Sequence, residues 1–219
     1  MSHYFSSDQS TLSEPFTIDI SFFGKSYPFV SDAGVFSKRQ FDYGSRVMLE
    51  AVIDQLSGRV LDLGCGYGPV GVLIGLHRPV ALTMVDVNPR AVELAKANAL
   101  AHGVAADVIV SDGLDKVSGV FDHILLNPPI RAGKAVIYRL FEQAYEHLAD
   151  GAQLIIVIRK KQGADSAKRK LQAIYDRVET IDRSGGYHVI VATRSALSDR
   201  DMADHEIGQD DHKAGVDDR

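Results

Sequence analysis

The chain has 219 residues, 45% of them hydrophobic, which indicates one globular domain with an apolar core. No apolar run reaches the roughly 18 residues of a membrane span, and the polar N-terminus lacks a signal-peptide layout, so we expect a cytoplasmic protein. Cys65 is the only cysteine, which excludes an internal disulfide and a cysteine-rich metal site, and we expect no metal.

The net charge of −5 arises near the C-terminus. From Ser198 onward the chain has eight acidic and three basic residues, whereas the preceding part has 21 of each. This segment also has few aliphatic side chains and no aromatic ones, so we expect residues 197–219 to form a disordered acidic tail. Because the rest of the chain is neutral overall, the charge balance does not argue against an RNA partner.

The N-terminal part predicts a hairpin, a loop and a helix. Residues 16–30 alternate loosely between apolar and polar and break at Gly24-Lys25, which is typical of a β-hairpin. A glycine-containing loop follows. Residues 45–56 have apolar spacing near 3.6 and predict a helix that Gly58 ends.

From residue 59 onward, strands and helices alternate. The expected strands are 59–63, 81–86, 107–111, 123–127 and 153–159. The expected helices are 69–76, 88–101, 136–148 and 164–175, and a closing hairpin pairs 178–182 with 188–193. Five strands separated by helices predict a parallel sheet with both faces covered and right-handed crossovers.

Polar or glycine-rich segments follow four successive predicted strands, and ligands of doubly wound sheets bind at such carboxyl ends. The first segment, 62–68, lets the backbone turn sharply and approach a ligand, and the next helix offers free N–H groups. Asp86 can accept both hydroxyls of a ribose, and Asp112 can accept an adenine amino group. Each of these features is also compatible with a simple turn.

The fourth segment is Asn127-Pro128-Pro129-Ile130. The prolines stiffen the turn, so the Asn127 side-chain oxygen and the Pro128 carbonyl form two fixed acceptors for an amino group on an aromatic ring. Such a nitrogen is a poor nucleophile, and catalysis would consist of positioning and charge stabilisation. A strand-ending asparagine cap is the alternative interpretation.

These motifs resemble those of a known family. Residues 60–71, 85–92, 111–113 and 127–130 resemble the class I methyltransferases that act on amino groups. Residues 32–49 and 127–134 resemble more narrowly the bacterial small-subunit ribosomal RNA guanine-N2 methyltransferases, in a short single-domain form. The resemblance covers roughly residues 16–194.

The resemblance implies an α/β fold: a Rossmann-like, mostly parallel seven-stranded sheet with helices on both faces, an antiparallel last strand and a preceding N-terminal β-hairpin. Residues 1–44 would be the hairpin and a cofactor-covering loop, and residues 45–196 the methyltransferase domain. The implied cofactor is S-adenosylmethionine. Its implied contacts are Phe36, Asp42, Gly44, Ser45, Asp62, Gly64, Cys65, Gly66, Gly68, Asp86, Val87, Asp112, Gly113 and Asn127. The implied catalytic residues are Asn127, Pro128, Pro129 and Ile130.

The expected partner is ribosomal RNA or the small ribosomal subunit. Cations that follow two of the predicted strands would ring the pocket and bind phosphates. They are Arg131, Lys134, Arg159, Lys160 and Lys161, with Arg139 nearby in sequence. A solvated charged face is the alternative.

Other functions remain open at this point. Ile130 stands where related families have an aromatic residue, which leaves adenine N6 or a protein glutamine amide as alternative acceptors. A nicotinamide-dependent oxidoreductase is a further alternative, although the spacing Gly64-x-Gly66-x-Gly68 differs from the dinucleotide fingerprint. A non-catalytic RNA-binding module would leave the set of acids and Asn127 unexplained.

Overall fold

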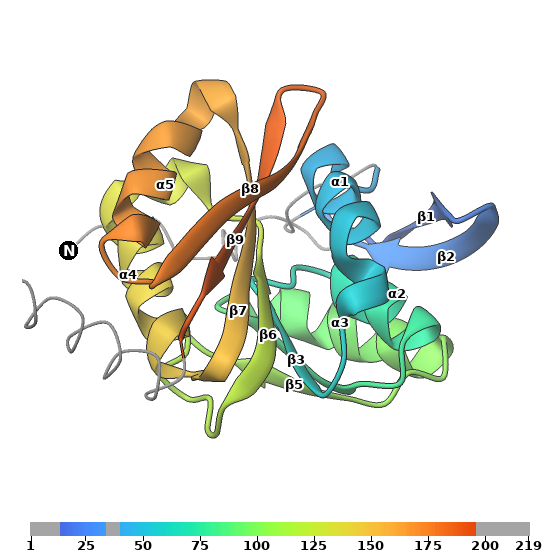
Figure 1. Ribbon diagram of the computed structural model, residues 1–219. Coiled ribbons are helices and arrows are strands. Elements are labelled where there is room, and N and C mark those ends of the chain that lie inside the picture. The colour runs from blue at the N-terminus through green and yellow to red at the C-terminus, as the bar shows by residue number, and fades with distance from the viewer. Residues whose placement is uncertain (1–13, 34–39, 196–219) are drawn as a thin grey trace, which may run out of the picture.

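The protein is described by a computed structural model that covers residues 14–33 and 40–195. Phe36 and the expected acidic tail lie outside the described residues. The central sheet has seven strands in the order β5-β4-β3-β6-β7-β9-β8 (Figure 1). They are β3 (Arg59–Leu63), β4 (Ala81–Asp86), β5 (Ala106–Val110), β6 (Phe121–Leu126), β7 (Leu148–Arg159), β8 (Arg177–Ser184) and β9 (Tyr187–Thr193).

The sheet confirms the expected topology. Strands β3 to β7 pair in parallel, β9 pairs antiparallel with β7, and β8 lies at the edge, antiparallel to β9. The chain builds outward from β3 through β4 to β5, and then returns to place β6 on the other side of β3. The carboxyl ends of β3 and β6 therefore flank a topological switch point, where open α/β sheets bind ligands.

Helices cover both faces of the sheet (Figure 1). On one face lie α1 (Tyr43–Val52), α2 (Pro69–His77) and α3 (Pro89–Ala101), and on the other lie α4 (Lys134–Glu146) and α5 (Ala164–Gln172). Each face has its own cluster of buried apolar side chains. Short 3-10 turns, η1 (Ile53–Gln55), η2 (Ile130–Ala132) and η3 (Lys160–Gln162), follow α1 and the carboxyl ends of β6 and β7.

The expectation that helices separate all five strands was wrong at one place. Between β5 and β6 the chain forms only turns, over residues 111–120. Gly113 and Gly119 both adopt positive φ there, which favours turning rather than helical backbone. The Cβ of any residue replacing Gly113 would lie 2.2 Å from Gln143 Oε1, so α4 packs directly against this turn.

Several boundaries also differ from the prediction. The first helix starts at Tyr43 rather than at residue 45, because the Asp42 carboxylate accepts the Ser45 N–H as an N-cap at 2.8 Å. The strand predicted over 153–159 begins at Leu148, so α4 ends earlier than expected.

The N-terminal hairpin is tied to the glycine turn by one buried side chain. Strands β1 (Phe16–Phe22) and β2 (Lys25–Ser31) pair antiparallel and place Ile20 and Phe29 in the core. Asn98 of α3 donates to the carbonyls of Val30 at 2.9 Å and Tyr67 at 2.8 Å, and its Oδ1 accepts the Val30 N–H at 2.9 Å. The side chain thus links the hairpin, α3 and the turn after β3.

Replacing Asn98 by Ala should destabilise the protein by about 3 kcal/mol, because it leaves buried backbone groups of Val30 and Tyr67 without hydrogen-bond partners. Urea denaturation measures this loss. Lys96→Ala, at an exposed position of the same helix, is the control and should shift the unfolding free energy by less than about 0.5 kcal/mol. Equal effects for both variants would show that Asn98 does not anchor the hairpin.

Candidate functional site

The glycine turn after β3 is held against the end of β4. The N–H groups of Gly64 and Cys65 both donate to the Val85 carbonyl, at 2.7 and 2.9 Å. The Gly66 N–H donates to the Asp86 carboxylate at 2.8 Å. Hydrogen bonds to the Val85 carbonyl and to the Asp86 side chain therefore fix the shape of the turn at the switch point.

The three glycines of this turn have different roles. All have positive φ: 77° at Gly64, 58° at Gly66 and 89° at Gly68. A Cβ at Gly64 or Gly66 would meet nothing within 4 Å, so these two face open space that a ligand can approach closely. A Cβ at Gly68 would lie 3.0 Å from the Ala95 side chain, so this glycine serves the packing of α2 on α3.

Asp62 is a buried carboxyl behind the turn. It is 4% exposed, and its Oδ2 accepts the Gly71 N–H at the start of α2, at 2.9 Å. Burial raises the pKa of Asp62 to about 7, the Gly71 hydrogen bond opposes this rise, and the charge of Asp86 adds to it. Through this hydrogen bond, the buried Asp62 carboxyl stabilises the connection between the glycine turn and α2.

Asp86 and Asp112 both lie at the carboxyl edge, but each already has partners. The two oxygens of Asp86 accept the N–H groups of Gly66 and Asn88, each at 2.8 Å, and burial raises the pKa of this carboxyl. A ribose would have to use the remaining lone pairs of Asp86. Asp112 is exposed and forms an ion pair with Arg139 of α4. Arg139 is the cation that lies near the expected phosphate-binding residues in the sequence.

Asn127 is oriented by two side chains from the start of α1. Its Nδ2 donates to Asp42 Oδ2 at 2.9 Å and to Ser45 Oγ at 3.0 Å. A carboxylate can only accept, so the nitrogen of the amide must face Asp42. The Asn127 Oδ1 consequently points away from α1 and is the atom that can accept a hydrogen bond from a ligand.

These groups line a narrow cleft between α1, the glycine turn and the end of β6. Its walls come from four residues at the start of α1, from Asp62, from the glycine turn and the residues after it, and from Asn127; the first and third groups are Phe41, Asp42, Ser45 and Met48, and Gly64, Cys65, Gly66, Tyr67, Pro69 and Val70. The cleft encloses about 40 Å³, less than a nucleoside-sized ligand needs, so such a ligand would extend over the open edge toward Asp86 and Asp112. Tyr67 is one of the lining residues, and its buried hydroxyl has no hydrogen-bond partner within the described part of the chain.

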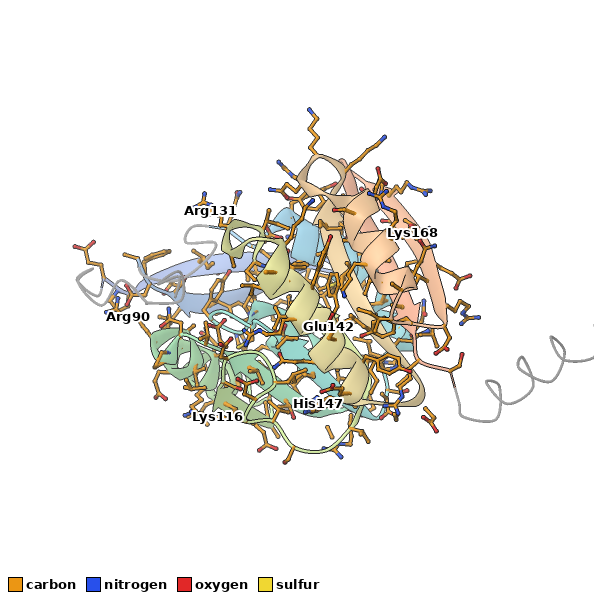
Figure 2. The ribbon with its side chains drawn as sticks, turned by 90° about the vertical axis from the view of Figure 1, so that its left-hand side faces the viewer. Arg90, Lys116, Arg131, Glu142, His147 and Lys168 are labelled. Atoms are coloured by element: carbon orange, nitrogen blue, oxygen red, sulfur yellow. The ribbon has the colours of Figure 1, made fainter. Side chains whose placement is uncertain are left out.

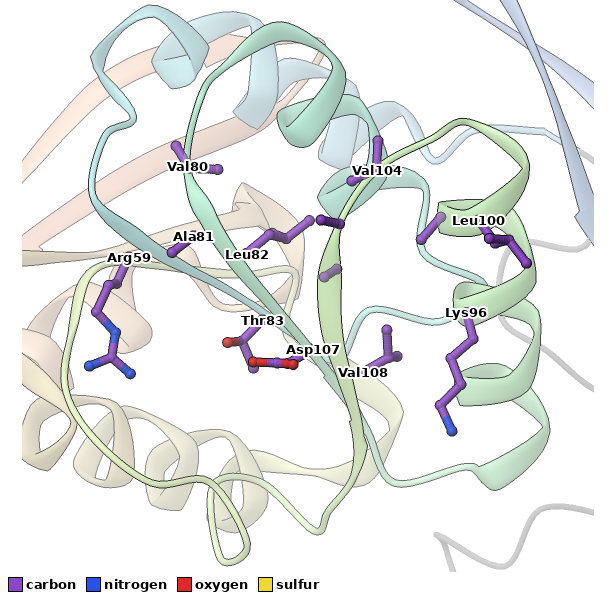
Figure 3. Close-up of a pocket in the computed structure, with 13 residues that line it drawn as sticks. Arg59, Val80, Ala81, Leu82, Thr83, Lys96, Leu100, Val104, Asp107 and Val108 are labelled. Carbon is purple, nitrogen blue, oxygen red and sulfur yellow. The ribbon is translucent and has the colours of Figure 1, made fainter.

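A larger hollow of about 650 Å³ lies elsewhere (Figure 3). Its walls include Arg59, Ala81 and Ala106, which are the first residues of β3, β4 and β5. The hollow is therefore at the amino ends of the strands, opposite the edge where such sheets bind ligands. We assign the site to the smaller cleft for that reason.

The remaining residues expected around the site differ in burial. Pro128 is buried, and the half-buried Ile130 packs against the core on the α4 side. Cys65 is buried, and burial raises the pKa of its thiol. Val87 and Pro129 are half-buried. Gly44 is buried, with no room for a Cβ beside the Tyr187 ring.

The expected RNA-facing cations are exposed at the same edge of the sheet. Arg131 lies within η2 and Lys134 begins α4, both after β6, while Arg159 ends β7 and Lys160 and Lys161 begin η3. Figure 2 shows Arg131 well separated from Lys168 of α5. In α5, Lys168 lies 3.5 Å from the Thr180 hydroxyl and Lys170 pairs with Glu142, so both are engaged in packing α5.

Sequence reasoning missed two residues of this region. Asn98 could not be predicted because its contacts join segments that are distant in sequence. Tyr67 could not be predicted because only the tertiary structure shows that it is buried. In the described ranges, no group of three metal-ligating side chains comes together. No described helix has both the length and the apolar character that crossing a membrane requires.

A Rossmann-like sheet with a glycine turn, an acid after the next strand and an Asn-Pro-Pro turn at the switch point defines a methyltransferase-type domain. The chain belongs to the methyltransferase small domain family, whose model matches residues 26–191.

Two relatives place the chain within this family. It is 41% identical to the uncharacterized protein YbxB of Bacillus subtilis, over 88% of this chain and 98% of that protein. It is 34% identical to ribosomal RNA small subunit methyltransferase C of Klebsiella pneumoniae, over 73% of this chain and 44% of that protein. The chain thus spans less than half the length of that longer relative.

The fold is also that of a solved structure. The 16S rRNA N2 methyltransferase RsmC of T. Thermophilus, in complex with AdoMet and guanosine, superposes with a TM-score of 0.72. The match is 24% identical and covers 84% of this chain and 51% of that one.

Asp62→Asn should make the protein progressively more stable than the wild type as the pH rises from about 4 to about 7. In this window the folded wild type holds a proton on Asp62 that the unfolded chain has lost, so its stability falls with rising pH. The neutral amide has no such cost. The difference in unfolding free energy should grow by roughly 1.4 kcal/mol per pH unit.

Urea denaturation at several pH values across that window measures the difference. Asp54→Asn, which removes an exposed carboxylate from η1, is the matched control. A constant difference between Asp62→Asn and the wild type across the window would contradict the assignment.

Proposed function

We propose that the protein transfers a methyl group from S-adenosylmethionine to the exocyclic N2 amino group of a guanine in small-subunit ribosomal RNA. The observation that carries this proposal is the orientation of Asn127. Asp42 and Ser45 take both hydrogens of its amide and leave Oδ1 as an acceptor beside the glycine turn. An acceptor in this place suits a substrate nitrogen that has hydrogens to donate.

The residues around the cleft fit the proposed cofactor. The open space at Gly64 and Gly66 lets a ligand approach the backbone. Asp86 would hold the ribose through its remaining lone pairs. Asp112 would accept a hydrogen bond from the adenine amino group while it keeps its ion pair with Arg139. When bound, S-adenosylmethionine supplies an electrophilic methyl group.

The chain's own contribution to the chemistry is alignment. Asn127 Oδ1 and the Pro128 carbonyl would each accept one hydrogen of the target amine, which fixes the plane of the amine and directs its lone pair. Asp42 and Ser45 would keep Asn127 from rotating as the nitrogen develops positive charge. Such preorganised acceptors stabilise the transition state without reorganisation.

The choice of RNA rests on the relatives and on surface charge. The relative that is 34% identical is a ribosomal RNA small subunit methyltransferase, and the exposed cations of residues 131–134 and 159–161 lie at the same edge as the cleft. Ile130 faces the core rather than presenting an aromatic ring for stacking. Adenine N6 and a protein glutamine amide are the alternative acceptors.

A methyl-transfer assay tests this proposal directly. Purified protein is incubated with radiolabelled S-adenosylmethionine and, separately, unmodified ribosomal RNA, small subunits or total cell protein. We expect label in RNA, recovered as N2-methylguanosine after nuclease digestion and mass analysis. Label in protein would instead support a glutamine amide as the methyl acceptor. Label on adenine would show that adenine, not guanine, is the target base.

Asn127→Ala should lower kcat at least about 100-fold while leaving cofactor affinity nearly intact, because it removes an acceptor used in the transition state. Ser45→Ala removes one hydrogen bond to the Asn127 amide and should lower kcat about fivefold. Turnover kinetics and calorimetric titration with S-adenosylmethionine measure the two quantities.

Asp42→Asn is the matched control for these variants. An amide oxygen in place of Asp42 Oδ2 still accepts from both Ser45 N and Asn127 Nδ2 and still caps α1, so kcat should stay within about twofold of the wild type. If Ser45→Ala lowers cofactor affinity as far as turnover, Ser45 contacts the cofactor instead of orienting Asn127.

A further inference from the structure

Tyr43 presents an exposed aromatic ring just outside the cleft. It is the first residue of α1, directly after Asp42, and it is 47% exposed. Its hydroxyl lies 3.2 Å from Ser184 Oγ at the end of β8, within hydrogen-bonding distance. Tyr43 does not line the cleft, although its neighbours Asp42 and Ser45 do. The ring is therefore anchored at one end and lies beside the site, not inside it.

A second aromatic ring and a cation extend this surface. The Tyr187 ring centroid is 5.8 Å from that of Tyr43, and the Arg159 guanidinium lies 4.8 Å from the Tyr187 centroid. Arg159 and Tyr187 are paired residues of β7 and β9. We call Tyr43, Tyr187 and Arg159 the aromatic platform.

Two glycines make room for the two rings. A Cβ at Gly185 would lie 2.5 Å from Tyr43 Cε1, and a Cβ at Gly44 would lie 2.6 Å from Tyr187 Cε1. Any side chain at either position would push a ring out of place. The tip of the β8–β9 hairpin and the first turn of α1 thus fit each other through these rings, which gives the platform a fixed shape.

We propose that the aromatic platform stacks an unpaired RNA base that flanks the methylated guanine. This inference rests on the proposed function, since it assigns the RNA contact next to the target site. Single-stranded nucleic acids bind to exposed aromatic rings next to cations, and each stacked base contributes about 1–3 kcal/mol. Tyr43 offers exposed ring surface, while Arg159 and the exposed Lys160 and Lys161 offer charge for the adjacent phosphates.

The position of the platform decides which base it takes. The target base must reach Asn127 Oδ1 in the cleft, whereas Tyr43 follows the cleft residue Asp42 in α1 but does not itself line the cleft. A base on Tyr43 would therefore be a neighbour of the target in the RNA strand. Holding that neighbour would keep the target nucleotide splayed from the stack, which suits recognition of single-stranded or looped RNA.

The test measures binding and needs no methyl transfer. The probe is a short single-stranded oligoribonucleotide with one guanine flanked by adenines, compared with versions in which either flanking adenine is abasic. Fluorescence anisotropy at fixed salt gives the affinities. Tyr43→Leu should weaken binding of the intact probe about tenfold. Tyr43→Phe should bind like the wild type, because it keeps the ring and loses only the contact with Ser184.

A cycle between protein and probe isolates the stacking. One abasic position should weaken binding to the wild type about tenfold, and the same abasic probe should bind Tyr43→Leu no worse than the intact probe does. Phe23→Leu is the matched control. Phe23 is an exposed aromatic residue, 55% accessible, that contacts His77 at the end of α2, on the opposite edge of the sheet, and its loss should not change binding.

Arg159→Gln provides a second variant that does not alter Tyr43. It should reduce the slope of log affinity against log salt by about 0.7, the value for one phosphate contact on a single strand. Circular-dichroism melting confirms that each variant is folded before its affinity is interpreted.

The outcomes separate this inference from the proposed function. Equal binding by Tyr43→Leu and the wild type, an abasic effect of the same size in both, or no binding of any probe by the wild type would each overturn the platform. Labelled RNA in the methyl-transfer assay together with any of these results leaves the proposed function standing alone. The expected cycle without methylated guanosine would support the platform and overturn the proposed reaction.

Discussion

The hydrogen bonds from the Asn127 amide to Asp42 and Ser45 join the two parts of the chain that form the site. Asn127 follows β6 in the sheet, whereas Asp42 caps α1, more than 80 residues earlier in the sequence. The same Asp42 oxygen accepts the Ser45 N–H, so the bond that starts α1 and the bond that orients Asn127 share one atom. The position of α1 over the sheet and the direction of the Asn127 oxygen are therefore fixed together.

Buried charge is concentrated behind the glycine turn. Asp62 and Asp86 repel each other, and burial raises the pKa of both carboxyls. Backbone N–H groups of Gly66, Gly71 and Asn88 offset this cost. A turn supported by partly compensated acids is less stable than an apolar one would be. It does, however, leave carboxylate oxygens at the edge where a polar ligand can use them.

The topology explains why these features meet at one edge. The reversal of strand order between β3 and β6 separates the crossovers that cover the two faces and leaves a crevice between the carboxyl ends of these strands. The glycine turn lies on one side of this crevice and Asn127 on the other. The β8–β9 hairpin, which runs back along β7, brings Tyr187 and Ser184 to the same edge beside Tyr43 (Figure 1).

The sequence by itself determined the order of strands and helices and the four segments at the strand ends, because apolar periodicity, glycines and prolines act locally. Short buried strands such as 59–63 and 81–86 have the predicted bounds. The general expectation that helices separate the strands failed between β5 and β6, where Gly113 and Gly119 adopt positive φ and α4 packs against the turn. Only the tertiary structure decided that Asp112 pairs with Arg139, that Asn98 ties the hairpin to the glycine turn, and that Asn127 is oriented by α1. Each of these contacts joins residues at least 27 positions apart, and no local pattern specifies which distant side chains the packing of helices on the sheet brings together.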